Sequence, residues 1–339
     1  MQNLKQRGSE AMADKKKVLV FRELPDDQLA RLAAVHDVTV ANPRIAAQKA
    51  AFDAALPEAQ GLIGSSYPVD AELLARAPKL EVVSSVSVGV DNYDLGALHA
   101  RGVLLCHTPG VLTETVADTV FALLMATSRR VVELANLVRE GRWDKNIGAD
   151  LFGRDVHGKT LGILGFGRIG QALARRGALG FGMPVLYNTR RPVDLATQAP
   201  ELVGHAQYAS FADLLARSDI VVAMLPLSES TRGIMDAKAF AQMKAGAIFI
   251  NGGRGATVRE DALLAALDSG HLHAAGLDVF ATEPLPLDSP LRTHPRVTAL
   301  PHIGSATHET RHGMAVLATS NLLQTLAGQR PAATYDTGE

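Results

Sequence analysis

Four stretches of the chain carry residue types that could do chemistry together. Gly165-Phe-Gly-Arg-Ile-Gly170 has the spacing G-x-G-x-x-G, and Arg254 lies in the glycine-rich segment Asn251-Gly-Gly-Arg-Gly255. Asp278 and Glu283 flank a short turn, and His302 follows Pro301. A glycine loop of this kind can cradle a pyrophosphate. An arginine, a carboxylate and an imidazole can hold an anionic substrate and move a proton.

The glycine loop has the sequence context that dinucleotide binding requires. The apolar run Thr160–Leu164 predicts a strand before it, and a helical pattern runs from Arg168 to about Leu179. The first glycine permits the turn, the second lets the backbone approach phosphate, and the third allows close helix–strand packing. The N–H groups at the start of the helix then attract the phosphates. A purely structural glycine turn is the alternative, because glycine is common in this chain, with 30 residues.

The residue that should meet the adenosine ribose is Asn188, since 188 − 170 = 18 and the expected spacing is about 20 residues. An acid at this position would repel a 2′-phosphate, whereas asparagine does not. Arg190 and Arg191 add planar cationic donors suited to phosphate. We therefore expect NADP(H) to be preferred and NAD(H) to be possible. The alternative is that both arginines are solvated surface residues.

Short apolar runs alternate with helical patterns along almost the whole chain. This alternation predicts βαβ units and parallel sheets, hence an α/β fold with two Rossmann-like doubly wound domains. Because ligands bind beyond the carboxyl ends of such strands, Arg254, Asp278, Glu283 and His302 can converge on one crevice. The strands expected in the first half are Val18–Phe21, Val38–Val40, Gly61–Gly64, Leu80–Ser84 and Val103–Cys106, with helices over Pro25–Val35, Ile45–Ala55 and Ala71–Ala77. Those expected in the second are Thr160–Leu164, Pro184–Tyr187, Ile220–Leu225, Ala247–Ile250, Ala275–Val279 and Val297–Leu300.

Between the two series, Thr113–Glu140 reads as one long helix without proline or glycine. Thr113 or Thr115 could cap it, and Asp118 stands three residues after Thr115, as in a capping box. Such a helix either connects domains, forms an interface or is a buried core helix. Trp143, the only tryptophan, follows it and is expected to meet the core, a partner subunit or the substrate crevice.

Composition limits the remaining possibilities. The 339 residues suffice for two domains, and a formal charge of −1 gives no basic excess for electrostatic capture of nucleic acid. A single cysteine, Cys106, excludes an internal disulfide framework and a thiolate metal cluster. No secretory h-region and no apolar run long enough to span a membrane is found, so we expect a cytoplasmic protein. A second Met at position 12, followed by a charged run, suggests that residues 1–11 are a leader, a tag remnant or an early start before the true first strand.

From about Lys17 to Leu326 the chain resembles the D-2-hydroxyacid dehydrogenase family. The resemblance rests on the glycine loop, Ser218-Asp-Ile-Val221 with Leu225-Pro-Leu227, the Arg254 segment, Asp278-Val-Phe with Glu283-Pro284, and Pro301-His302-Ile-Gly304. Three further segments look most like bacterial glyoxylate/hydroxypyruvate reductases that also reduce 2-ketogluconate. They are Val86-Ser-Val-Gly-Val-Asp-Asn92, His107-Thr-Pro with Leu112-Thr-Glu-Thr-Val-Ala-Asp118, and His302-Ile-Gly-Ser-Ala-Thr-His-Glu-Thr-Arg311.

The resemblance implies a role for each matching residue. Arg254 binds the substrate carboxylate and polarises the keto oxygen, His302 is the general acid, and Glu283 orients His302. A neighbouring carboxylate favours the charged, proton-donating form of an imidazole. Val88 and Gly89 contribute backbone groups to the carboxylate, and no metal is needed. The implied cofactor contacts are Thr115, Gly165, Phe166, Gly167, Arg168, Ile169, Gly170, Asn188, Arg190, Arg191, Leu225, Pro226, Gly253, Asp278 and Gly304.

The resemblance also implies a domain plan and a function. Residues 1–112 and 301–339 form the substrate domain, and 113–300 form the NADP(H)-binding domain inserted into it. The expected reaction is NADPH-dependent reduction of a 2-keto acid, namely glyoxylate, hydroxypyruvate or 2-ketogluconate, to the D-2-hydroxy acid. A homodimer is expected, in which the region around Trp143 serves as an arm. His107, His294, His308 and His312 are expected to be structural or surface residues.

Two alternatives stay open at this point. A phosphoglycerate-type dehydrogenase of the same family would want extra basic residues or a regulatory domain after residue 339. A dinucleotide-sensing scaffold or corepressor on the same fold could keep Arg254, Glu283 and His302, and would differ by binding cofactor without turnover.

Overall fold

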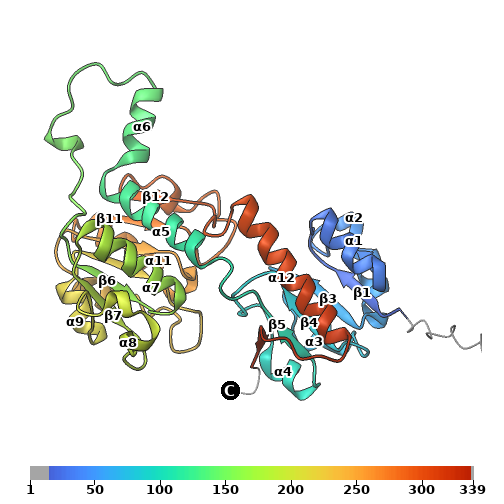
Figure 1. Ribbon diagram of the computed structural model, residues 1–339. Helices are drawn as coiled ribbons and strands as arrows, with labels where there is room; N and C mark the ends of the chain where they lie inside the picture. Colours follow the sequence, from blue (N-terminus) through green and yellow to red (C-terminus); the bar gives the residue numbers. More distant parts are fainter. Residues whose placement is uncertain (1–14, 337–339) are drawn as a thin grey trace, which may run out of the picture. The chain divides into compact units, whose positions relative to one another are not determined.

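The computed structural model describes residues 15–336, so the suggested leader at residues 1–11 lies outside the described residues. The chain divides into two units (Figure 1): unit 1 comprises Met1–Val111 and His308–Glu339, and unit 2 comprises Leu112–Thr307. The sequence suggested that the chain returns to unit 1 at Pro301, but in the structure unit 2 continues to Thr307. The reason is that backbone N–H groups of Ile303 and Gly304 donate to the Asp278 carboxylate, which keeps this loop with unit 2.

Unit 1 is built on a six-stranded sheet in the order β13-β5-β4-β3-β1-β2. All its strand pairs are parallel except β13 with β5. Along the strands alternate side chains enter opposite layers, so both faces are buried. Helices α1 and α12 cover one face, and α2, α3 and α4 cover the other. The elements are β1 (Lys17–Val20), α1 (Asp26–Val35), β2 (Asp37–Val40), α2 (Ala46–Ala55), β3 (Gly61–Gly64), α3 (Ala71–Ala75), β4 (Val82–Ser85), α4 (Leu95–Ala100), β5 (Leu104–Cys106), α12 (His308–Leu326) and β13 (Thr334–Tyr335).

Unit 2 contains a seven-stranded parallel sheet in the order β12-β11-β10-β9-β6-β7-β8. Numbered within the unit, this is 3-2-1-4-5-6 with one more strand, the order of a dinucleotide-binding sheet. Its elements are α5 (Thr113–Ser128), α6 (Val131–Arg139), β6 (Leu161–Leu164), α7 (Arg168–Arg175), β7 (Val185–Asn188), α8 (Leu195–Gln198), β8 (Ala206–Tyr208), α9 (Phe211–Arg217), β9 (Ile220–Ala223), α10 (Ala237–Gln242), β10 (Ala247–Asn251), α11 (Glu260–Asp268), β11 (Leu272–Leu277) and β12 (Val297–Ala299). The predicted α/β class with two parallel-sheet domains is confirmed. Strands β8 and β13 were not predicted.

Short turns of helix complete the chain. Leu56–Glu58, Ala149–Leu151, Pro200–Leu202, Gly255–Thr257 and Pro290–Arg292 are 3-10 turns, and a π-helical turn at Arg176–Gly180 extends α7. Helices α9, α10 and α11 supply the buried apolar layer on one face of the unit 2 sheet. On its other face α5 packs directly on β11, where a Cβ added at Gly276 would lie 2.5 Å from the Thr127 hydroxyl.

The single long helix predicted over Thr113–Glu140 is wrong. The structure has two helices, α5 and α6, separated at Arg130, whose φ is +55°. The Arg130 guanidinium pairs with Glu133 and also donates to the carbonyl of Asp150, contacts that hold this left-handed residue in place. The predicted caps are also wrong, because Leu112 is the N-cap and makes no side-chain cap bond.

The segment after the break stands out from the rest of unit 2 (Figure 1). Within the chain α6 buries none of its residues. Trp143 is 62% exposed, so it is not packed in the core of its own chain. No helix among residues 15–336 is long and apolar enough to cross a membrane.

Candidate active site

The glycine loop lies between β6 and α7, as predicted. Gly165 has φ +91°, and a Cβ there would lie 2.6 Å from the carbonyl oxygen of Met224. At Gly170 a Cβ would lie 2.3 Å from the Gly165 carbonyl oxygen, so this glycine lets α7 pack closely on the strand. Gly167, the N-cap of α7, has open space where a Cβ would be. The loop therefore has the close packing and the open backbone that a pyrophosphate site needs.

The residues beside this loop occupy defined positions. Phe166 is buried and stacks on Tyr187 with ring centroids 4.1 Å apart, which makes it part of the core beneath the loop. Arg168 is exposed and Ile169 partly buried in the first turn of α7. Leu225 and Pro226 follow β9, the strand next to β6, and Leu225 packs against the unit 2 core.

Asn188 is the last residue of β7, and its side-chain N–H donates to the carbonyl oxygen of Ala209 at 2.8 Å. A carboxylate in the same place would set an oxygen against that carbonyl. Arg190 and Arg191 follow it, and both are exposed. The hydroxyl of Thr189 donates to the Arg191 carbonyl and thereby tightens the turn. The position of Asn188 thus suits a neutral hydrogen-bond donor and not a carboxylate, and two exposed cations follow it.

Arg254 follows β10 in a turn fixed by hydrogen bonds. The Asn251 side chain donates to the Arg254 carbonyl and accepts from the Gly253 N–H, and the Thr257 hydroxyl donates to the same carbonyl at 2.6 Å. The guanidinium donates to the Gly253 carbonyl at 3.0 Å. Gly255 permits the approach of the next loop, because a Cβ there would lie 1.8 Å from the backbone carbon of Phe280.

Two acids follow β11 and have different environments. Asp278 is 1% exposed, and its two carboxylate oxygens accept from the Ile303 N–H at 2.8 Å and the Gly304 N–H at 2.9 Å. Burial raises the pKa of Asp278, although these two amide bonds act in the opposite direction. Asp278 therefore clamps the loop that carries His302 to the end of β11.

Glu283 and His302 are in direct contact. The Nδ1 atom of His302 lies 2.7 Å from Glu283 Oε2, while Glu283 Oε1 accepts from the Phe280 N–H at 3.0 Å. Burial favours a raised pKa for Glu283, but hydrogen bonds from His302 and Phe280 outweigh it, and the pKa is lowered. The charge of Arg254 contributes in the same direction, which places the guanidinium within electrostatic reach. His302 itself has φ +53°, an uncommon conformation for a residue with a Cβ.

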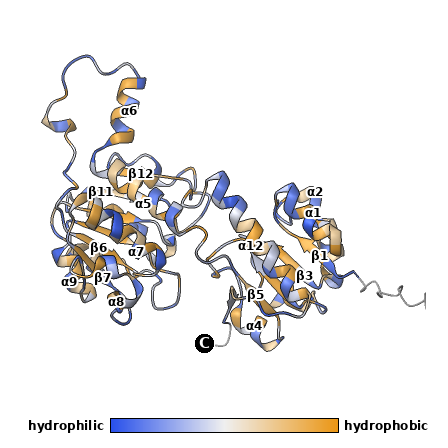
Figure 2. Cartoon of the chain, in the orientation of Figure 1, coloured by the Kyte–Doolittle hydropathy of each residue, from blue (hydrophilic) through white to orange (hydrophobic). Residues whose placement is uncertain are grey.

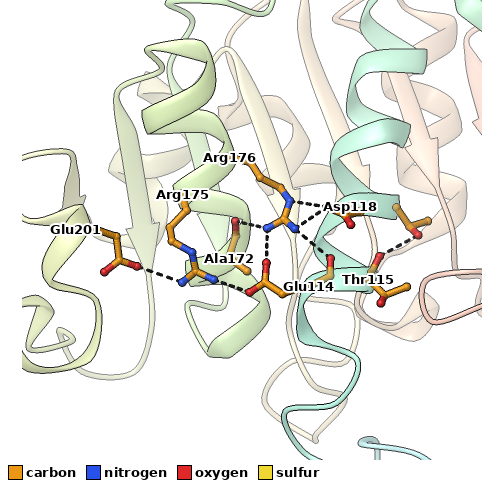
Figure 3. Close-up of polar contacts among 8 residues, drawn as sticks. Glu114, Thr115, Asp118, Ala172, Arg175, Arg176 and Glu201 are labelled. Atoms are coloured by element: carbon orange, nitrogen blue, oxygen red, sulfur yellow. Dashed lines mark hydrogen bonds and ion pairs between the residues drawn. The ribbon is translucent and has the colours of Figure 1, made fainter. Parts of the chain in front are cut away.

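A charged cluster ties the start of α5 to the C-terminal end of α7 (Figure 3). Arg176 pairs with Asp118 at 2.5 Å and with Glu114 at 2.9 Å, and Arg175 pairs with Glu114 at 2.6 Å and Glu201 at 3.2 Å. Asp118, predicted as part of a capping box, serves this cluster instead. Since the N-terminus of α7 is the predicted phosphate site, the cluster fixes the helix that must receive the phosphates.

Helix α5 also reaches the loop of His302. The Thr119 hydroxyl lies 3.1 Å from the carbonyl of Thr115 and 3.2 Å from that of Gly304, each a possible acceptor for its proton. Two predicted cofactor residues, Thr115 and Gly304, are therefore brought together by a residue that the sequence analysis did not identify. The other functional contact it missed is the clamp from Asp278 to the backbone of the same loop.

Val88 and Gly89 lie in unit 1, in the loop that follows β4. The His107 ring contacts the Val88 carbonyl, and the Gly89 N–H donates to the Ser87 hydroxyl at 3.2 Å. Among the described residues, no group of three or more His, Cys, Asp or Glu side chains could hold a metal ion.

Comparison with known proteins places this geometry in a family. Residues 121–304 match the family described as D-isomer specific 2-hydroxyacid dehydrogenase, NAD binding domain. The chain belongs to this family. It is 56% identical over 317 residues to glyoxylate/hydroxypyruvate reductase B of Klebsiella pneumoniae, covering 93% of this chain and 96% of that protein. It is 52% identical over 318 residues to the enzyme of that name in Escherichia coli, with the same coverage of each chain.

Solved structures agree. A Thermus thermophilus protein, 42% identical, superposes with a TM-score of 0.85 and covers 94% of this chain and 100% of its own. The NADPH-dependent glyoxylate/hydroxypyruvate reductase of Sinorhizobium meliloti, solved with NADP and malonate, is 30% identical with a TM-score of 0.85. That match covers 96% of this chain and 98% of the other. The predicted membership of the D-2-hydroxyacid dehydrogenase family is thus confirmed.

Proposed function

We propose that this dehydrogenase reduces small 2-keto acids to D-2-hydroxy acids with NADPH, and that His302 is the general acid. The observation that carries the proposal is the 2.7 Å contact between His302 Nδ1 and Glu283 Oε2, formed where Arg254 acts electrostatically on the same carboxylate. An arginine for an anionic substrate and an oriented imidazole for a proton are what reduction of a keto acid requires.

The chemistry follows from these groups. Because Nδ1 of His302 is engaged by Glu283, the other ring nitrogen, Nε2, is left to give its proton to the keto oxygen. Arg254 binds the substrate carboxylate and polarises the keto group. When bound, NADPH would supply the hydride for the keto carbon, so that the C=O π bond breaks while a C–H and an O–H bond form. Val88 and Gly89 hold the carboxylate through backbone groups.

The residues of unit 2 fit a dinucleotide. Gly167 leaves open space at the N-terminus of α7, where a pyrophosphate would be held, and the end of β7 carries Asn188, Arg190 and Arg191 near the expected 2′-phosphate. We propose that Thr115, Leu225, Pro226, Gly253, Asp278 and Gly304 complete the site. Asp278 retains lone pairs for the nicotinamide amide beyond the two amide bonds it already accepts.

The cofactor preference is tested with a double variant. Arg190→Ala combined with Arg191→Ala should lower the NADPH-to-NADH ratio of kcat/KM by about tenfold or more, because charge-assisted phosphate contacts are lost. Arg217→Ala, at the exposed end of α9, is the control. An unchanged ratio in the double variant would refute the phosphate contact. Asn188→Asp is less suitable, since its carboxylate would oppose the Ala209 carbonyl.

The function itself is tested by following oxidation of NADPH and NADH with glyoxylate, hydroxypyruvate and 2-ketogluconate in parallel. The relatives are named for the first two acids, and we propose all three as substrates. We expect turnover with NADPH that differs among the acids. His302→Ala should then lower kcat by orders of magnitude while NADPH binding is retained. Cofactor binding without turnover of any acid would favour a dinucleotide-sensing scaffold. The cytoplasmic location stays a prediction.

We also propose a homodimer that uses α6 and the loop after it. The segment exposes Val131, Val132, Val138, Trp143, Ile147 and Phe152, and Figure 2 shows hydrophobic colour along α6. Exposed apolar residues concentrated on one projecting segment indicate a protein partner. Val138→Asp with Trp143→Glu should yield a monomer in size-exclusion chromatography with light scattering. Val203→Asp, exposed elsewhere in unit 2, should not alter the mass. A monomeric parent protein would refute the proposal.

A further inference from the structure

The loop that follows β4 lies next to the residue that follows β5, because these two strands are adjacent in the sheet. Strands β4 and β5 pair in parallel, with Ser84 opposite Cys106, so their carboxyl ends lie together. His107 comes directly after Cys106, and the loop of residues 86–91 comes directly after Ser85. Two hydrogen bonds join them: the Thr108 N–H donates to the Ser87 carbonyl at 3.0 Å, and His107 Nδ1 lies 3.1 Å from the Val88 carbonyl oxygen.

The second of these bonds fixes the tautomer of His107. A carbonyl oxygen can only accept, so Nδ1 must carry the proton. It also fixes a peptide plane, because the Val88 carbonyl and the Gly89 N–H belong to the same peptide unit. In a trans peptide these two groups point in opposite directions. Holding the carbonyl on His107 therefore aims the Gly89 N–H away from His107, where it donates to the Ser87 hydroxyl at 3.2 Å. A bound carboxylate would take the place of this hydroxyl as the acceptor.

His107 is itself held from three sides by the C-terminal part of unit 1. Its N–H donates to the Ala333 carbonyl at 3.1 Å, and its carbonyl accepts from the side chain of Asn321, a buried residue of α12, at 3.1 Å. The ring meets Tyr335 of β13 edge to face, with centroids 5.3 Å apart and planes at 89°. Because its backbone and its ring are both held, His107 can in turn hold the Val88 carbonyl in one position.

We propose that His107 is a positioning residue for the substrate carboxylate. It acts through the Val88–Gly89 peptide, whose N–H it directs, and the last strand of the chain holds it in place. This inference rests on the proposed function, because it assumes that Gly89 binds the carboxylate. It assigns His107 a part in keto-acid affinity and none in proton transfer. Loss of the bond should therefore raise KM for the keto acid and leave kcat and NADPH binding nearly unchanged.

Two variants separate the donor from the ring. His107→Asn keeps an N–H donor at the position of Nδ1 but loses the ring contact with Tyr335. His107→Phe keeps the ring but loses the donor. His99→Phe, the same change at an exposed histidine of α4, is the control. Because one neutral hydrogen bond is removed, we expect KM of the Phe variant to rise about three- to tenfold. The Asn variant should stay within about twofold of the parent, since its donor is retained.

The outcomes are distinct. A raised keto-acid KM in His107→Phe, with rescue in His107→Asn and equal melting temperatures, supports the proposal. Equal KM values in the parent and His107→Phe would overturn it, as would an equal rise in both variants. If His107→Phe does not fold, His107→Leu decides, because it also removes the donor to the Val88 carbonyl and its KM must rise above that of His107→Asn. Failure of the proposed function would appear differently, as absence of keto-acid turnover in the unmodified protein.

Discussion

Replacing Glu283 with glutamine tests whether the Glu283 carboxylate favours the protonated form of His302, the proposed general acid. The parent carboxylate accepts twice, from the Phe280 N–H through Oε1 and from His302 through Oε2. Glutamine has one oxygen, and the Phe280 amide can only donate, so the new NH2 group must face His302 Nδ1. That arrangement requires an unprotonated Nδ1 and disfavours the imidazolium.

The structure gives the size of the effect. A hydrogen bond to a charged group is worth about 1.5–3 kcal/mol. The His302 side chain is 47% exposed and that of Glu283 is 35% exposed, so screening by water reduces this to about 1–2 kcal/mol. We therefore expect kcat/KM for keto-acid reduction to fall about 5- to 30-fold near neutral pH.

The measurement is a pH profile of keto-acid reduction for the parent and Glu283→Gln between about pH 5 and 9. Glu260→Gln is the matched control, because Glu260 accepts from the neighbouring Ala281 N–H at 2.8 Å in the same region. NADPH affinity, followed by fluorescence, should be unchanged in both variants. If Glu283→Gln has the same profile as Glu260→Gln, the reasoning about His302 is refuted.

Three stability predictions complete the set. Gly255→Ala should cost about 3 kcal/mol or more in unfolding free energy, because its Cβ would overlap the Phe280 backbone, whereas the Cβ of Gly96→Ala would make only an ordinary contact with the Asp94 side chain at 3.6 Å and should be tolerated in the same urea titration. Thr119→Val should lower the free energy of unfolding by about 1 kcal/mol through its lost carbonyl bond, and an unchanged urea midpoint would contradict this. The pKa of Asp219 is lowered because the bonds from Lys244 and the Thr160 amide outweigh the opposing effect of burial. The stability that the Lys244–Asp219 pair contributes should thus be present above about pH 4, the ordinary aspartate range, and be lost as pH falls below it. Lys244→Met should therefore be less stable than the parent above this pH and equally stable well below it.

The sequence predicted the central strands because they are continuous apolar runs buried on both faces. The elements it missed lack that pattern. Strand β8 is Ala206–Tyr208, largely exposed at the sheet edge, and β13 has two residues. The break between α5 and α6 has no glycine or proline to mark it. It depends on the contacts of Arg130 with Glu133 and the Asp150 carbonyl, and Asp150 lies 20 residues later.

In the candidate site, too, some residues could be predicted from the sequence and some contacts could not. Arg254, Glu283 and His302 could be predicted because their side-chain types are distinctive and each follows a predicted strand. The supporting contacts could not, because their partners are backbone groups that every residue possesses. The clamp from Asp278 to two amides and the bond from His107 to a carbonyl become visible only when the strand ends are placed together.

The two acids after β11 illustrate why placement decides function. Asp278 and Glu283 are five residues apart, yet the pKa of the first is raised and that of the second is lowered. The oxygens of the buried Asp278 accept hydrogen bonds from the backbone of the His302 loop and so help to hold His302 in a left-handed conformation. Glu283, more exposed, keeps its charge beside the imidazole. Environments that separate the properties of two carboxylates separate their roles. One acid therefore fixes the position of the loop that carries His302, and the other places a negative charge beside its imidazole.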